Sequence, residues 1–539
     1  MTRTTTMFSL CVASLLAVGL IGCGQGGGGF SKREQASNQK VATFRYPIPT
    51  NPTTLDPAKV EDGDTIDLLQ QVFEGLVAWN EKNEVEPRLA EKWELKDGGA
   101  TVVFTLRKGV KFHNGKEMTS EDVKWSIERA CNPKVASPVA SAYMGDIVGL
   151  NDMVEGKATS VKGIETPDPM TVVFKLDKPR PYWIGKFTYL CSAVMPKGGV
   201  PADAEITKPE QMIGTGPFKV TEFVNEQVVK LSANKDYYGG APKVESIERP
   251  VVKDAVTRLS MYKTGEVDLV ALERQDVAAI QKDPAMKDQL KFFDRPAIWY
   301  VGLNLKKYPA FQNRKLRQAI AMAIDKEKIV NELLGGINTL ANGVIPPGVK
   351  GYREKAAVIP YDPNGAKKLL AEAGYPDGKG IPPLELWFRD GRPDAKIVSE
   401  AVAGQLEKSL GIQPKLTVKN WPVYLEKRNQ LEIPFFHMRW AADYLDPENF
   451  ISFFFASYGP ENKIGYSNPA LDALTSKADA MPDGPERMDL YHQAEDLALQ
   501  DAVLIPIYFQ RDAELISPRV SGLRESIFGH LPHTTVEVK

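Results

Sequence analysis

One segment of the chain is the most informative about its architecture: Trp93-Glu-Leu-Lys-Asp-Gly-Gly-Ala-Thr-Val-Val-Phe-Thr-Leu-Arg107. In residues 101–106 every second side chain is apolar, which predicts a strand with one buried face. Thr119 and Asp122 then follow at the spacing of a capping box, so we expect a helix to begin there. A strand followed closely by a helix indicates a mixed α/β chain.

Further strand and helix signals alternate along the chain. Residues 171–176 nearly repeat the pattern of 101–106, and we interpret them as two similar strands rather than as a true sequence repeat. Capping residues, apolar periodicity and terminal glycines predict helices over about 314–334, 363–374, 395–410 and 485–500. We therefore expect α/β lobes with open sheets, whose ligands bind in crevices between elements or domains.

Length and charge limit what the chain can be. At 539 residues it is too long for one small core, so we expect two or more lobes. A hydrophobic content of 43% with 25% charged residues is typical of a globular protein. The net charge of -2 offers no electrostatic surface for nucleic acid or anionic lipid, so neither is an expected partner.

The N-terminal residues have the layout of a secretory signal. Arg3 precedes a charge-free run that is short for a membrane span and ends in Leu20-Ile21-Gly22-Cys23. This tetrapeptide resembles a bacterial lipobox, which implies that Cys23 is acylated, becomes the N-terminus and anchors the protein through lipid alone. A signal cut elsewhere and a transmembrane helix are the alternatives. Glycines and polar residues as far as residue 40 predict a flexible tether.

Two cysteines stay in the mature chain if Cys11 leaves with the signal and Cys23 is acylated. In an oxidising compartment, Cys131 and Cys191 could form a disulfide. Their spacing does not establish that they meet, so two separate buried thiols is the open alternative.

Several blocks together resemble one known family. Residues 93–107, 108–115 and 119–123 are similar to the signature of the family 5 extracytoplasmic solute-binding proteins, the dipeptide-, oligopeptide- and nickel-binding components of bacterial ABC importers. Similar blocks follow in the family's order over essentially the whole mature chain: Leu55-Asp56-Pro57, Glu74-Gly75-Leu76, Gly214-Thr-Gly-Pro-Phe218, Lys315-Leu-Arg-Gln-Ala319, Gly374-Tyr375 and Gly465-Tyr-Ser-Asn-Pro469.

The resemblance implies a fold and a division of the chain. The fold would be the α/β, two-lobe periplasmic-binding-protein (flytrap) fold, with an extra α+β domain inserted in the first lobe. The implied parts are the signal peptide 1–22, the lipidated tether 23–40, the first lobe 41–73, 206–295 and 511–539, the inserted domain 74–205, and the second lobe 296–510.

The strongest candidate for a ligand contact is Asp443. Trp440-Ala-Ala-Asp-Tyr444 resembles the Trp-x-Ala-Asp-Tyr motif of oligopeptide-binding members, in which the aspartate receives the α-amino group of the ligand. An ammonium group removed from water is costly unless a carboxylate meets it with charge-assisted hydrogen bonds. The alternative is that Asp443 only caps a turn before Asp446-Pro447.

The resemblance places further residues near the ligand. Trp440 offers a flat apolar wall, and the backbones of Arg439 and Ala441 could pair with an extended ligand as an added strand. Glu61 and Gly63 resemble the first-lobe segment that faces the ligand, although a plain surface turn is the alternative.

Cationic residues are candidates for the carboxylate of a peptide. Arg389 and Arg428 align with arginines of peptide binders, and His437 stands where such binders have arginine, which weakens that contact near neutral pH. Tyr300 and Asn304 align with a segment near the cleft. For all five, a structural or core position is the alternative.

These residues predict a binding protein rather than an enzyme. We expect no catalytic residues, bound metal or cofactor, because the chain lacks a Gly-x-Ser-x-Gly elbow and a His-Glu-x-x-His motif. The expected partners are a di- or oligopeptide and an ABC permease with its ATPase subunits, and the protein is expected to be a monomer outside the cytoplasm. A nickel chelate, an oligosaccharide, a cell-wall peptide and a peptide-sensing role are the alternatives.

Overall fold

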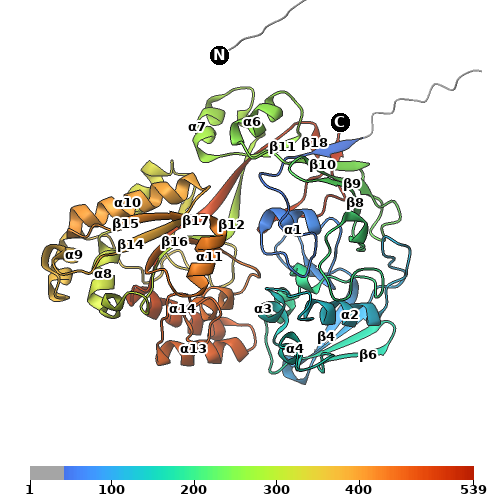
Figure 1. The fold of residues 1–539 in the computed structure, drawn as a ribbon, viewed down its shortest axis with the longest axis horizontal. Helices are drawn as coiled ribbons and strands as arrows, with labels where there is room; N and C mark the ends of the chain where they lie inside the picture. The colour runs from blue at the N-terminus through green and yellow to red at the C-terminus, as the bar shows by residue number, and fades with distance from the viewer. Residues whose placement is uncertain (1–41) are drawn as a thin grey trace, which may run out of the picture. The chain divides into compact units, whose positions relative to one another are not determined.

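The computed structural model describes residues 42–539. The predicted signal peptide and tether, with Cys23, lie outside these residues. The described chain mixes helices with several separate sheets, in agreement with the α/β prediction (Figure 1). None of its helices within residues 42–539 is long and apolar enough to cross a membrane.

The largest sheet of the described residues has seven strands in the order β11-β17-β12-β16-β14-β15, with β13 beside β17. Its strands are β11 (Leu269–Ala271), β12 (Leu290–Leu303), β13 (Thr339–Leu340), β14 (Glu385–Arg389), β15 (Lys415–Lys419), β16 (Phe435–Ala441) and β17 (Leu504–Ile516). β14 runs parallel to both of its neighbours, and the other pairs are antiparallel. The largest hydrophobic core, formed by residues from 298 to 509, packs around this sheet.

Two smaller sheets lie in other parts of the described chain. One has the order β1-β10-β9-β8, with β1 (Thr43–Arg45), β8 (Phe218–Val224), β9 (Val228–Ala233) and β10 (Ser246–Pro250). The other is antiparallel with the order β4-β5-β7-β6, from β4 (Ala90–Lys96), β5 (Thr101–Leu106), β6 (Ile164–Asp168) and β7 (Thr171–Lys175). Short pairs are formed by β2 (Val77–Trp79) with β3 (Val85–Pro87), β18 (Val520–Ser521) with β21 (Glu537–Val538), and β19 (Glu525–Ser526) with β20 (Gly529–His530).

The two similar strands of the sequence are β5 and β7, and they lie side by side in one sheet. Alternate residues of β5, at 102, 104 and 106, are buried, as the pattern predicts. The helix that follows β5 in the sequence begins at the predicted capping box. In this box the carboxylate of Asp122 accepts a hydrogen bond from the backbone N–H of Thr119 at 3.0 Å. Local sequence signals therefore determine this region.

The described residues contain helices where capping signals predict them at about 363–374, 395–410 and 485–500, together with many helices that are not predicted from the sequence. The helices of these residues are α1 (Gly63–Leu69), α2 (Ser120–Ala130), α3 (Ala140–Met144), α4 (Leu150–Val154), α5 (Trp183–Lys186), α6 (Ala255–Lys263), α7 (Arg274–Lys282), α8 (Arg314–Met322), α9 (Pro363–Glu372), α10 (Pro393–Leu410), α11 (Trp421–Asn429), α12 (Ser452–Phe455), α13 (Pro469–Ala480) and α14 (Pro485–Gln500). α10 ends at Gly411, which takes the left-handed conformation with φ 68° that glycine adopts without strain.

One predicted helix is wrong. The segment expected to be continuous over 314–334 is α8 followed by a separate π-helical turn, Lys328–Leu333. Asp325 starts that second turn, because its carboxylate accepts from the N–H of Lys328 at 2.9 Å. The N–H of Asp325 itself donates to the side chain of Gln405 at 2.8 Å, a contact with α10 that the local sequence does not reveal.

β12 and β17 cross from one part of the chain to another (Figure 1). Their pairing is irregular between Asp294 opposite Arg511 and Ile298 opposite Phe509, so β12 has extra residues at this point. The lobe boundaries expected from the resemblance, 295/296 and 510/511, fall at the same irregularity. We propose that these boundaries, and that of the inserted domain at 74–205, divide the described chain.

Cys131 and Cys191 are free thiols in this structure, so the disulfide considered for them is not formed. Both are buried in the hydrophobic core of residues 58–194. Burial raises the pKa of the Cys131 thiol to about 12, so both the thiol's reactivity and its access to oxidants are low. The alternative of two buried thiols is the one the structure contains.

Candidate ligand-binding site

Asp443 lies just after the end of β16 with its side chain half-buried. Its backbone N–H donates to the side-chain oxygen of Asn449 at 3.0 Å, which fixes the turn. Burial raises the pKa of its carboxyl to about 7, a hydrogen bond from Tyr143 lowers it, and the charge of Glu461 raises it further. The charge of Arg439 also lowers this pKa, but no basic side chain of residues 42–539 forms an ion pair with Asp443.

The neighbours of Asp443 come from distant parts of the sequence. Tyr143, in α3, stacks on Tyr189 with ring centroids 3.8 Å apart, and the charge of Asp443 contributes to a raised pKa in both hydroxyls. Glu61 is exposed to solvent, yet desolvation is the largest cause of its raised pKa, followed by the charges of Asp62 and Glu461. A side chain that is both exposed and desolvated lies in a recess. Segments of the two predicted lobes therefore meet around these carboxylates.

One edge of β16 is open beside Asp443. β16 pairs with β12 as far as Ala441, but with β14 only at Phe435 and Phe436. The N–H of Ala442 donates to the carbonyl oxygen of Pro296 in β12. The alternate residues Arg439 and Ala441 therefore direct their backbone groups to the opposite edge of β16. Within the described chain no strand covers that edge beyond Phe436.

Trp440 is partly core and partly exposed. Its indole N–H donates to the carbonyl oxygen of Asn449 at 3.1 Å, and its ring packs on Phe453 and Phe454 with centroids 5.3 Å away in both cases. These contacts hold the indole in place next to the turn that carries Asp443. It can therefore serve as a wall of the recess and as a packing residue at once.

Arg428 and Arg389 differ in whether a carboxylate of the protein pairs with their guanidinium group. Arg428 is 3% exposed, and its guanidinium forms an ion pair with Glu461 at 2.7 Å. Arg389 is half-buried, lies over the ring of Trp421 at 4.1 Å, and forms no ion pair with any residue that the structure describes. Its Nε is buried without a hydrogen-bond partner. Arg389 is thus the predicted cation with unused binding capacity.

His437 lies in the core of the sheet and is not a cation in the recess. This corrects the expectation that it is a candidate contact for the carboxylate of a peptide. It is 1% exposed, and its ring stacks on Trp299 with centroids 5.2 Å apart. Both ring nitrogens lack partners, and burial lowers the pKa of the imidazole to about 3. The residue is therefore neutral at physiological pH.

Tyr300 and Asn304 are also buried, each 1% exposed. The hydroxyl of Tyr300 accepts a long hydrogen bond from Arg428 at 3.4 Å. The Asn304 amide donates to the carbonyl oxygens of Leu431 and Ile433, both at 3.0 Å. Its oxygen accepts from two following backbone N–H groups, so its polar capacity is used inside the protein. The core alternative fits both residues better than ligand contact.

Gly63 is the first residue of α1, after the capping residue Asp62. Nothing lies within 4 Å of the place where a Cβ would stand, so the space beside it is open. Sequence reasoning missed Tyr143, Tyr189 and Glu461, which surround the Asp443 carboxylate. No motif marks them, because they reach this point only through tertiary contacts.

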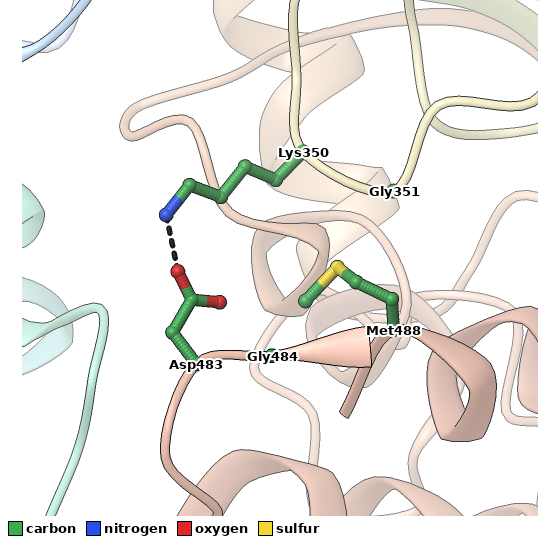
Figure 2. Close-up of a pocket in the computed structure, with 5 residues that line it drawn as sticks. All are labelled: Lys350, Gly351, Asp483, Gly484 and Met488. Atoms are coloured by element: carbon green, nitrogen blue, oxygen red, sulfur yellow. Dashed lines mark hydrogen bonds and ion pairs between the residues drawn. The ribbon is translucent and has the colours of Figure 1, made fainter. Parts of the chain in front are cut away.

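Two other features carry no ligand-binding signal. A shallow pocket of about 330 Å³ is lined by Lys350, Gly351, Asp483, Gly484 and Met488, and the Lys350 ammonium pairs with the Asp483 carboxylate there (Figure 2). None of these five is a predicted site residue.

The second feature is a group of possible metal ligands: Glu514, Glu525 and His530. Burial lowers the pKa of His530, but the two carboxylates outweigh it and raise the pKa to about 10. The imidazole is therefore protonated and has no lone pair for a metal. Its Nε2 lies 2.9 Å from Glu514 and its Nδ1 lies 3.1 Å from Glu525. In this structure the three side chains form a charge network.

Comparisons with known proteins identify the family and the fold of the chain. Residues 84–462 match the family described as bacterial extracellular solute-binding proteins, family 5. A probable deoxycholate-binding periplasmic protein of Escherichia coli is 31% identical over 89% of this chain and 90% of its own length. Heme-binding protein A of Haemophilus influenzae is 30% identical over 92% of each chain.

A solved structure extends the match to the fold. The murein tripeptide-binding protein of Escherichia coli superposes with a TM-score of 0.81 at 26% identity, covering 93% of this chain and 99% of that one. The family match spans well over half of the chain, and the structural match shows the two-lobe fold. The chain therefore belongs to the family 5 bacterial extracellular solute-binding proteins.

Proposed function

We propose that this protein is a lipid-anchored, non-enzymatic receptor that captures di- or oligopeptides outside the cytoplasm and delivers them to an ABC importer. The carboxylate of Asp443 would receive the ammonium group of the peptide. The peptide would lie between the two lobes, which close on it by hinge motion. The observation that carries the proposal is the unpaired, recessed carboxylate of Asp443.

The electrostatics of Asp443 support an ammonium ligand. A carboxylate with a pKa raised to about 7 is held in an unfavourable, desolvated environment. A bound ammonium group would supply the missing positive charge, and the exclusion of water by closure would strengthen their attraction. The negative charge of Glu461 also raises the pKa of Asp443. Arg428 forms an ion pair with Glu461 and therefore neutralises part of that negative charge.

The open edge of β16 and Arg389 support an extended peptide with a free C-terminus. A peptide added along Arg439 and Ala441 would gain main-chain hydrogen bonds that do not depend on its side chains. Arg389 ends β14, on the other side of the open edge from β16, and its planar guanidinium suits a carboxylate. The recess would then match both charges of a zwitterionic peptide, with Glu61, Gly63 and Trp440 as further walls.

The anchor and the partners follow from the sequence and the family. We propose acylation at Cys23, a tether over 23–40, and a permease with ATPase subunits as the receiver of the ligand. We also propose that the protein acts as a monomer. Mass spectrometry of the N-terminal peptide from membranes, with Cys23→Ser as the control, tests the anchor. An unmodified Cys23, or a signal cut elsewhere, would rule it out.

A second ligand class is favoured by the comparisons. The deoxycholate-binding and heme-binding relatives are named for ligands that carry carboxylates but no ammonium group. Such a ligand could use Arg389 while leaving Asp443 unpaired. The murein tripeptide-binding neighbour favours a cell-wall peptide, which would use both. A nickel chelate, an oligosaccharide and a sensing role have no such support.

Native mass spectrometry of protein purified without denaturation tests the proposal. We expect released masses of peptides, and we expect Asp443→Ala to weaken peptide binding in calorimetry by about 2–5 kcal/mol. Glu91→Gln, at an exposed residue of β4 outside the recess, is the control. A retained bile acid or haem, or unchanged peptide affinity in Asp443→Ala, would contradict the peptide assignment.

A further inference from the structure

Three arginines gather at one end of the open edge, and we call them the arginine cluster: Arg389, Arg392 and Arg439. Arg389 is the last residue of β14, and Arg439 lies near the end of β16, which runs parallel to β14. Arg392 is the capping residue of α10, directly after β14. Ligands of α/β sheets bind outside the carboxyl ends of parallel strands, which is where this cluster stands.

The three guanidinium groups are close enough to repel one another. Desolvation lowers the pKa of Arg389 to about 10, and the charges of Arg392 and Arg439 lower it further. Desolvation likewise lowers the pKa of Arg439, although its side chain is exposed to solvent, so it too lies in a recess. Like charges held together in such a place create a positive potential that an anion would relieve.

The nearest carboxylates are mostly used by other cations. Asp394, two residues after Arg392, accepts two hydrogen bonds from Arg274, one of them from Nε at 3.0 Å. Asp512, which raises the pKa of Arg439, forms an ion pair with Arg295 at 2.6 Å. These acids therefore do not neutralise the cluster.

The remaining contacts compensate the charge of the cluster only in part, since Asp443 acts on Arg439 without forming an ion pair with it. Arg439 donates from Nε to the neutral side-chain oxygen of Gln510 at 2.6 Å. Asp390 and Asp64 act on Arg389 and Arg392 only at longer range, because neither forms an ion pair with the cluster in the described residues. Three positive groups thus lie at this end of the open edge, where a single terminal carboxylate needs one bidentate arginine.

We propose that Arg392 and Arg439 bind a second anionic group of the ligand, the side-chain carboxylate of an acidic residue at or next to its C-terminus. Arg389 keeps the terminal carboxylate. This inference rests on the proposed peptide function and specifies it: the preferred ligands are acidic at the carboxyl end. Hydrogen bonds between arginine and a carboxylate are among the strongest in proteins, so the preference is measurable.

The test is calorimetry with matched peptide pairs of two, three and four alanine-based residues that end in Glu or in its uncharged isostere Gln. We expect the Glu peptide to bind at least about ten-fold more tightly than its Gln partner at low salt, and the ratio to shrink as salt is added. Arg392→Gln and Arg439→Gln should each reduce that ratio, and the double variant should bring it near unity. Lys396→Gln, which removes a positive charge from the exposed side of α10, should leave the ratio unchanged.

The outcomes separate this inference from the function on which it rests. If peptides bind but Glu and Gln pairs have equal Kd values, the inference is wrong and the peptide function stands. If the double variant weakens both members of a pair equally, the two arginines have a structural role and the inference is also wrong. If no peptide of any length binds, both proposals fall together.

Discussion

Replacing Asp443 by Asn should stabilise the folded protein while it removes the charge on which peptide binding depends. The carboxyl has a pKa of about 7 in the fold, against an ordinary value of 3.8. The folded state therefore holds this proton more tightly than the unfolded state does, and the ionised carboxylate costs stability. That cost is absent below the unfolded pKa, grows as the pH rises, and is complete above about pH 7.

The size of the effect follows from the same two values. Each pH unit of difference corresponds to about 1.4 kcal/mol, which gives an upper limit of about 4 kcal/mol. Because the side chain is half-buried and water reaches it, we expect a gain of about 1–3 kcal/mol for Asp443→Asn near pH 8. Near pH 3 the gain should disappear, since the wild-type carboxyl is then largely protonated in both the folded and the unfolded state.

Urea unfolding followed by tryptophan fluorescence at several pH values measures this gain. Glu461→Gln is the matched control, because it removes a neighbouring carboxylate that is already paired with Arg428. That control should destabilise the protein by about 1–3 kcal/mol, since it leaves a buried guanidinium without its partner. The reasoning fails if Asp443→Asn is less stable than the wild type near pH 8, or if its gain does not depend on pH.

Three further predictions concern binding and the core. Peptide affinity should fall by up to about ten-fold per pH unit as the pH drops below 7, because Asp443 with a pKa of about 7 becomes protonated. Calorimetric affinities that stay the same between about pH 8 and 5 would contradict this. His437→Phe should bind peptide as the wild type does and unfold at the same or higher urea concentration, since the imidazole is neutral, buried and unpaired; weaker binding would place it against the ligand. Arg129→Gln should lower the free energy of unfolding by about 3–5 kcal/mol, because it leaves the fully buried carboxylate of Asp56 without its bidentate partner. A loss below about 1 kcal/mol in urea unfolding would refute this.

The parts of the fold that the sequence predicts are those with strong local signals. The alternation in β5 and the proline at the start of α14 act within a few residues, so bounds such as Pro485–Gln500 agree with the prediction. The break after α8 depends on a hydrogen bond between Asp325 and Gln405, which lie 80 positions apart. Local periodicity does not carry that information.

The candidate site divides in the same way. Asp443 and Arg389 were found through resemblance, and the structure adds why they differ from other charged residues: neither has an ion-pair partner in the described chain. The neutral state of His437 could not be read from its neighbours in sequence, because it results from burial against Trp299. The roles of Tyr143 and Glu461 likewise depend on segments brought together only by folding.

The most direct test of the account compares one peptide with a free and with an acetylated amino terminus, by calorimetry on the same protein. Acetylation removes only the ammonium charge that Asp443 is proposed to receive. We predict that it weakens binding to the wild type by at least about 2 kcal/mol and makes little difference in Asp443→Asn. Equal affinities of the two peptides for the wild type would contradict the central claim.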